Sequence, residues 1–562
     1  MSKIRNFLVA LGTIVALGGG AGSYWYFKVF NQTEGVLGAA ALVPDQALLA
    51  TFVSTDNQQW SAANNLGSPA VRDLLGDRAS SLQTEILQGS NLSYEADLAP
   101  WIDGIMVSLL PPTEVRSQSG QEPNLLIIVG IKDKLKALEF SNKMKSQKDM
   151  ELKSSDYKGV EMVELSKAGS TSTYSAVLGN YVAFSPEKRS VEWAIDTAKG
   201  GASLKDQPGA AKALGNALSL DNSIAQLYIP DYGGLINQQL ANSNQPPLSP
   251  NVLNQLGALD NVVAGVGVEK EGIRIRALVK LGETQENPQE NPFVYESSPG
   301  KILNVLPGDT LALLSGQNPQ SLWQNVVKQS ETNPDLQLVV EGVKRQLEQL
   351  QLDPDQDVFS WMTGEFALAA LPSADQSILG SIGVAGAIVI ESSDPDRTNT
   401  MLGKLDQLVE GNLSVEKTEV ASKAITYWRL PQGIFQNQAF LGYGWLNPST
   451  LFVALGDTAT QSLLQPSTLL TQNPEFQALV STLPKENGGY FYFKVAGLKE
   501  AVQAAAIGGQ YQALPVETQA LIEAIESVGI TTSQPSPEVS QVDVFFHLPP
   551  SSAELTPSAE PK

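Results

Sequence analysis

The chain has 562 residues, which is more than one hydrophobic core usually organises, so we expect at least two domains. Its formal net charge of −22 opposes the field of a nucleic acid, which argues against phosphate-backbone binding. Cysteine is absent, and this excludes disulfides, thiolate zinc sites and cysteine nucleophiles.

The first feature along the chain is an uncharged stretch over residues 7–27, which follows Lys3 and Arg5. At about 1.5 Å per residue in a helix, it matches a hydrocarbon core of about 30 Å. Aromatic residues at its end suit the headgroup region. We therefore expect a single transmembrane anchor, with residues 1–6 in the cytoplasm and the bulk of the chain on the other side of the membrane. A cleaved signal peptide is the alternative, although its apolar region is usually about 7–15 residues long.

Small residues within this stretch, Gly12, Ala16 and Gly20, have the spacing that lets two membrane helices approach closely. They predict a possible helix-dimer face. The alternative is that glycine is simply frequent in membrane spans. In both cases the expected partner of the stretch is membrane lipid.

After the anchor, residues 42–281 alternate strand and helix patterns and form the first predicted domain. Successive strands with short turns, interrupted by single helices, are typical of an α+β fold with a largely antiparallel, curved sheet and helices on one face. The predicted elements are a strand over 48–54, helical segments over 68–88, a helical turn at 97–101, strands over 104–110 and 124–131, a helix over 132–147, strands over 160–165, 173–178 and 181–184, a helix over 186–199, and strands over 224–229, 262–269 and 273–281.

A polar, proline-rich linker over 282–300 separates this domain from a second one over 301–548. The order of elements is the same, which predicts two tandem homologous α+β domains. Residues 549–562 have no periodicity and predict a disordered tail. The strands expected in the second domain are EFALAAL (365–371), GAIVIES (386–392), AITYWRL (424–430), QAFLGYGWL (438–446), TLFVALG (450–456), YFYFKV (490–495) and VDVFFHL (542–548), with a helix after residue 394.

The two domains share one local element most clearly, DLAPWIDGIMVSLLPP at 97–112 and DVFSWMTGEFALAALP at 357–372. An acid caps a helical turn, a tryptophan follows four positions later and a glycine begins the strand. We interpret this as a structural element, because caps, buried aromatics and turn glycines recur in most folds for these reasons. A paired aromatic platform for ligands would instead require both indoles to be exposed. The residues of this element are Asp97, Trp101, Gly104, Asp357, Trp361 and Gly364.

The anchor, the duplicated domain and this repeated element make the chain resemble DUF3352 (domain of unknown function 3352), an uncharacterised membrane-associated family of cyanobacteria. The resemblance extends over nearly the whole chain. It implies a setting in the envelope or thylakoid membrane, with the domains in the periplasm or lumen. It implies no cofactor and no catalytic residue.

Chemical motifs elsewhere are weak. His547 is the single histidine, so a multi-histidine metal site is excluded and a catalytic triad has one candidate base. Asp353, Asp355 and Asp357 have the spacing of a calcium loop, but Val358 stands where that loop needs glycine. Three Ser-x-x-Lys pairs match the spacing of a serine nucleophile with its base, as chance also would in a serine-rich chain: Ser155 and Lys158, Ser185 and Lys188, Ser414 and Lys417.

We therefore expect a non-catalytic, membrane-anchored extracytoplasmic scaffold or assembly protein with a protein partner still to be identified. The first alternative is a carrier or receptor that holds an apolar or small ligand in a sheet concavity or in a groove between the repeats. The second is a hydrolase that uses two carboxylates, since such chemistry needs neither His nor Cys.

Overall fold

The computed structural model describes residues 35–63, 66–67, 93–112, 123–145, 151–166, 172–241, 253, 256–257, 259–282, 295–373, 383–430, 438–495, 497, 519 and 522–548. The predicted anchor at 7–27, with Gly12, Ala16 and Gly20, lies outside these residues, as do the tail at 549–562 and most of the predicted linker. Among the helices that are described, none combines the length and the apolar character needed to cross a bilayer.

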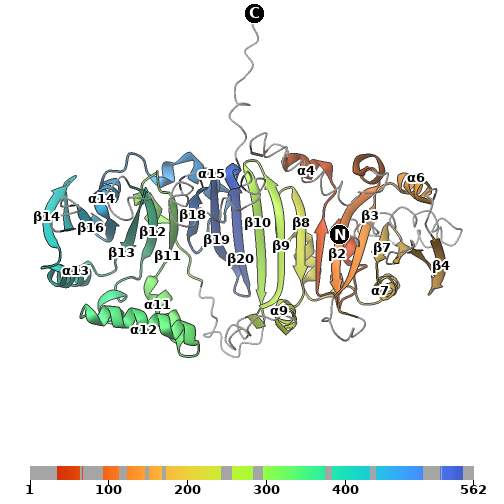
Figure 1. The fold of residues 1–562 in the computed structure, drawn as a ribbon, viewed down its shortest axis with the longest axis horizontal. Helices are drawn as coiled ribbons and strands as arrows, with labels where there is room; N and C mark the ends of the chain where they lie inside the picture. Colours follow the sequence, from red (N-terminus) through yellow and green to blue (C-terminus); the bar gives the residue numbers. More distant parts are fainter. Residues whose placement is uncertain are drawn as a thin grey trace, which may run out of the picture. The chain divides into compact units, whose positions relative to one another are not determined.

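The chain divides into two compact units (Figure 1). Unit 1 consists of residues 1–248, 256–270 and 274–283, and unit 2 consists of residues 249–255, 271–273 and 284–562. Both are built on antiparallel strands with intervening helices, so the prediction of an α+β fold with an antiparallel sheet is confirmed.

In unit 1 the strands lie in the order β4–β5–β6–β7–β3–β2–β1–β8–β9–β10. The strands β3 and β6 have the predicted bounds. The elements are α3 (Gly35–Ala40), β1 (Leu49–Val53), α4 (Asn57–Ala63), η1 (Tyr94–Leu98), β2 (Ile102–Leu110), β3 (Asn124–Ile131), α6 (Lys134–Lys145), β4 (Glu151–Tyr157), β5 (Val160–Ser166), β6 (Thr173–Leu178), β7 (Tyr181–Ser185), α7 (Lys188–Ala198), η2 (Leu204–Asp206), α8 (Ala210–Lys212), η3 (Ala213–Ala217), β8 (Ser223–Ile229), α9 (Tyr232–Ala241), β9 (Leu259–Glu269) and β10 (Gly272–Leu281).

In unit 2 the order is β14–β15–β16–β17–β13–β12–β11–β18–β19–β20, and every neighbouring pair is antiparallel. Strand for strand, this is the order of unit 1. The elements are η5 (Lys301–Val305), β11 (Ala312–Gln317), α11 (Pro319–Ser330), α12 (Pro334–Gln349), η6 (Pro354–Val358), β12 (Glu365–Pro372), β13 (Val384–Glu391), α13 (Pro395–Val409), β14 (Ser414–Val420), β15 (Lys423–Arg429), β16 (Ala439–Asn447), β17 (Thr450–Leu455), α14 (Gly456–Leu464), η8 (Leu470–Gln472), α15 (Pro474–Thr482), β18 (Tyr490–Lys494), β19 (Ser527–Ser536) and β20 (Val539–His547).

Helices pack on both faces of each sheet, where we expected them on one face. In unit 2, Val389 and Ile390 are neighbours on β13 and therefore point to opposite faces. Val389 belongs to a buried cluster with α14 and α15, whereas Ile390 belongs to a second cluster with Met401 and Leu402 of α13. Unit 1 repeats this, with α7 in one cluster and α6 in the other. The physical reason is that both faces of these strands are apolar, so each face requires a cover.

Candidate functional site

The repeated acid–tryptophan–glycine element has the same geometry in both units. In unit 1, Asp97 Oδ2 accepts a hydrogen bond from Ser93 N–H at 2.9 Å, and Oδ1 lies 2.6 Å from Lys143 Nζ on α6. The indole N–H of Trp101 donates to the Asp97 carbonyl at 2.8 Å. The acid thereby closes the helical turn and ties it to the following helix.

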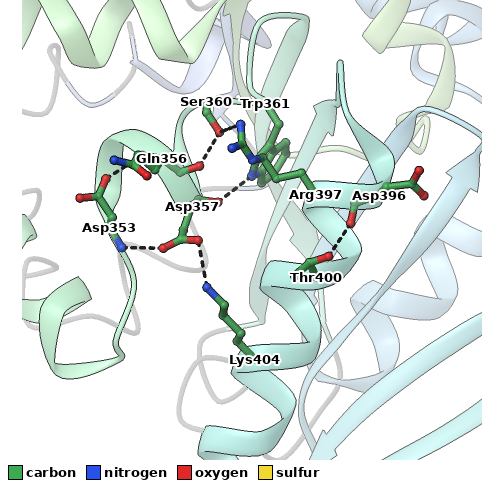
Figure 2. Close-up of polar contacts among 9 residues, drawn as sticks. All are labelled: Asp353, Gln356, Asp357, Ser360, Trp361, Asp396, Arg397, Thr400 and Lys404. Atoms are coloured by element: carbon green, nitrogen blue, oxygen red, sulfur yellow. Dashed lines mark hydrogen bonds and ion pairs between the residues drawn. The ribbon is translucent and has the colours of Figure 1, made fainter.

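Unit 2 reproduces each of these contacts (Figure 2). Asp357 Oδ2 accepts from Asp353 N–H at 2.9 Å, Asp357 Oδ1 lies 3.0 Å from Lys404 Nζ on α13, and Trp361 Nε1 donates to the Asp357 carbonyl at 3.0 Å. The backbone hydrogen bond from Asp353, followed by Lys404, holds the pKa of Asp357 below its ordinary value.

Both tryptophans of this element are only 1% exposed. Trp101 packs on Phe140 of α6, with the ring centroids 5.4 Å apart. Neither indole can receive a ligand from solvent, so the aromatic-platform alternative is not supported. The two rings instead fix a helix to the sheet.

The glycines of the element provide room for close packing. Gly104 has a φ of +80°, and a side chain there would collide with the ring of Phe52. At Gly364 a Cβ atom would lie 2.6 Å from the carbonyl oxygen of Glu391. Gly104 lies within β2, at the register shift between Ile102 and Ile105, and Gly364 directly precedes β12. The predicted turn into the strand is therefore found at Gly364 and not at Gly104.

Glu365 follows the second glycine and is the most buried glutamate in the described part of the chain, at 1% exposed. Its Oε1 accepts from the Ser298 hydroxyl at 2.6 Å and from the Gly300 N–H, and its Oε2 accepts from Ile302 N–H at 3.0 Å. These three donors engage both oxygens of the buried carboxylate, so we assign Glu365 the role of anchoring η5 to β12.

The acids with calcium-loop spacing do not converge. Asp353 Oδ1 accepts from Gln356 N–H at 2.7 Å, and Asp355 Oδ1 accepts from the indole N–H of Trp323 at 2.7 Å. Asp357 is already paired with Lys404. Each carboxylate serves a different structural contact, and these three acids are not among the described residues whose possible ligand atoms gather within 4.8 Å of one another.

The lysines of the Ser-x-x-Lys pairs are engaged in ion pairs. Lys158 Nζ lies 2.6 Å from Asp196, and this hydrogen bond raises the pKa of Lys158. Lys417 lies 3.4 Å from Asp406, and Lys188 lies 3.8 Å from Glu192. A general base must be neutral at working pH, and the contact with Asp196 favours the charged ammonium of Lys158.

Sequence reasoning missed a row of exposed apolar side chains on the sheet of unit 2. Leu314 on β11 lies directly opposite Leu368 on β12, and Leu368 lies opposite Ile388 on β13. On its other side, Leu314 lies opposite Phe491 on β18. Opposed residues of antiparallel strands project from the same face. The four side chains, 41–44% exposed, therefore form one continuous row, which we call the apolar row.

Sequence reasoning also missed a group of possible metal ligands. Glu475, Glu526 and His547 are far apart in the chain, yet their ligand atoms all lie within 4.8 Å of one another. No spacing motif connects them, because they come from α15, from the residue before β19 and from the end of β20. The single histidine excluded a multi-histidine site, but the sequence did not indicate that two carboxylates approach it.

Comparisons with known proteins identify the family of this chain but indicate no activity. No curated protein matches the chain. Crystal form III of TP0453 aligns at 11% identity with a TM-score of 0.26, covering 44% of this chain and 82% of that one. Crystal form I of TP0453 aligns at 12% identity with a TM-score of 0.25, covering 44% and 81%. The model of the family described as protein of unknown function (DUF3352) matches residues 9–548. Because that match extends over nearly the whole length, the chain belongs to the DUF3352 family.

Proposed function

We propose that this protein is a non-catalytic, membrane-anchored extracytoplasmic scaffold that binds a protein partner on the apolar row of unit 2. The anchor is supported by the uncharged stretch at 7–27. The observation that carries the binding role is the row itself, since contiguous exposed apolar side chains mark interaction surfaces in soluble domains.

The size of the row favours a protein partner over a small ligand. It crosses four neighbouring strands, from Phe491 through Leu314 and Leu368 to Ile388. With strands about 4.8 Å apart, this is a width of about 15 Å. An α-helix with its side chains is about 10–12 Å across, so one amphipathic helix of a partner would cover the row.

We also infer that the two units are copies of one ancestral domain. The identical strand order and the matching contacts of Asp97 with Asp357 and of Trp101 with Trp361 support this. Thr51 is the unit 1 counterpart of Leu314, because it lies opposite β2 and β8 at the same register position at which Leu314 lies opposite β12 and β18. If the units are copies, the apolar row is therefore a property that one copy acquired or retained.

Site-specific photocrosslinking in native membranes tests the binding role. A photoreactive residue replaces Leu314 in the full-length protein, and the matched control replaces Leu138 on α6, which is 39% exposed and lies in unit 1. We expect position 314 to capture one protein in stoichiometric yield and position 138 to capture none. Recovery of the same proteins from both positions, or of lipid alone from position 314, would contradict the scaffold proposal.

A second candidate function, small-ligand carriage, is favoured by one pocket of unit 2. It has a volume of about 360 Å³, which is within the range of ligand sites. Trp323 of α11 lines it and stacks on Phe359 with ring centroids 4.7 Å apart. Native mass spectrometry of the purified protein would support this function if a small molecule is retained and then lost in Trp323→Ala.

A further inference from the structure

Three side chains of unit 2 meet at one end of its sheet. Glu475 lies in the first turn of α15, Glu526 directly precedes β19, and His547 is the last residue of β20. The antiparallel pairing of Ser527 with His547 brings the last two together, and Glu526 N–H donates to the His547 carbonyl at 3.0 Å. The backbone therefore fixes the approach of these side chains.

Two atoms of this cluster are buried without a hydrogen-bond partner. The His547 side chain is 5% exposed, and its Nδ1, although 3.4 Å from Glu526 Oε2, makes no hydrogen bond. Glu475 Oε1 is likewise buried and unpaired, while its Oε2 lies 2.7 Å from Lys494 Nζ. A buried polar atom without a partner is costly, so two in one cluster indicate a missing ligand that both would bind.

We propose that Glu475, Glu526 and His547 bind a divalent transition metal ion of the Zn²⁺ class. One imidazole nitrogen and two carboxylate oxygens are a donor set that such ions accept, and three protein ligands leave a position for water. This inference is independent of the partner-binding proposal, because it concerns different residues.

To bind one metal ion, the three ligand atoms must move slightly closer together. With metal–ligand distances of about 2.1 Å, ligand atoms of a tetrahedral site are about 3.4 Å apart. The present separations are all within 4.8 Å, and the Glu526 side chain, 52% exposed, has room to move inward. The Glu475 carboxylate is oriented by Lys494 with Oε1 left available.

A second carboxylate completes the arrangement around the imidazole. Glu271 Oε2 lies 3.8 Å from His547 Nε2, on the side of the ring opposite Nδ1. Histidine ligands of metal ions commonly donate their other ring N–H to a carboxylate, which fixes the tautomer that binds the metal. Glu271 would act in this way as a positioning residue.

Metal binding is tested on the full-length protein in detergent. The protein is first stripped of metal with a chelator and then supplied with Zn²⁺ or Co²⁺. Excess Mg²⁺ is present to saturate surface acids that bind cations loosely. We expect one Zn²⁺ per chain by elemental analysis and a Co²⁺ visible spectrum typical of four or five ligands. His547→Gln and Glu526→Gln should abolish both, and Glu271→Gln should weaken binding by roughly tenfold.

The control variant is Glu348→Gln, which removes an exposed acid of α12 and should leave binding unchanged. Glu526→Gln alters an exposed group, so it keeps the test valid if His547→Gln fails to fold. Equal Zn²⁺ binding by wild type and Glu526→Gln, or no Zn²⁺ retained by the wild type, would overturn the proposal in favour of a simple ion pair between His547 and its carboxylate neighbours.

Discussion

Units 1 and 2 have one strand order, yet they differ in what their sheets leave uncovered. Ile127 of unit 1 and Ile388 of unit 2 occupy the same register position on β3 and β13, opposite Val107 and Leu368. Ile127 is 8% exposed and belongs to the buried cluster of Trp101, whereas Ile388 is 41% exposed. The comparison shows that one strand order is compatible with either outcome, so the side chains packed around each position decide whether a sheet face is buried or exposed.

The largest expected effect on stability concerns the acid–tryptophan–glycine element, which both units contain. Trp361→Ala and Trp101→Ala should each lower the free energy of unfolding of their own unit by about 3–5 kcal/mol, because each removes a fully buried ring. Hydrogen–deuterium exchange of peptides from each unit measures this separately. A loss below about 1 kcal/mol at one position would show that the two elements are not equivalent.

A smaller effect is expected at Asp357, which lies within η6, whereas the N-cap of this turn is Asp353. Asp357→Ala should cost about 1 kcal/mol at pH 7, since it removes the acceptor of the Asp353 N–H and an ion pair with Lys404. Because the folded state lowers the pKa of Asp357, the stabilisation is complete above the unfolded pKa of about 3.9 and is lost as the pH falls through the folded value. Unfolding midpoints of variant and wild type should therefore converge below about pH 4. Glu348→Gln is the control, and its unfolding midpoint should match that of the wild type at pH 7.

The smallest effect on stability is expected where the units differ. Leu314→Thr gives unit 2 the residue that unit 1 has at this position, and it should change the free energy of unfolding by less than about 0.5 kcal/mol, because Leu314 is 44% exposed. Binding of a hydrophobic dye should nevertheless fall, and Thr51→Leu is the reciprocal variant. Unchanged dye binding in Leu314→Thr would mean that the apolar row is not the surface to which the dye binds.

Sequence patterns predicted most strands because these are apolar and bounded by turns. β4 and β14 escaped prediction for the opposite reason: ELKSSDY and SVEKTEV are polar and largely exposed, without the alternation that marks a half-buried strand. The faces covered by helices were also mispredicted, since a strand that is apolar on both faces does not specify which helix packs where.

The candidate sites were less accessible to prediction than the fold. EFALAALP alternates large and small apolar residues, and this pattern does not distinguish a covered face from an open one. The cluster of Glu475, Glu526 and His547 depends on strand register between distant segments, which no local motif encodes. By contrast, the acid–tryptophan element could be recognised because the hydrogen bonds of its acid and tryptophan, apart from the lysine contact, are local.

The two polar strands that escaped prediction have a consequence for solubility. Among the described residues, β4 pairs with β5 alone and β14 with β15 alone, so each has one side with unpaired backbone groups. Such an edge is a template for strand addition by another chain, and charged side chains are a common protection. Glu151, Lys153, Glu416 and Lys417 lie on these strands. These charges would oppose edge-to-edge aggregation at β4 and β14 while leaving the exposed sheet face of unit 2 accessible.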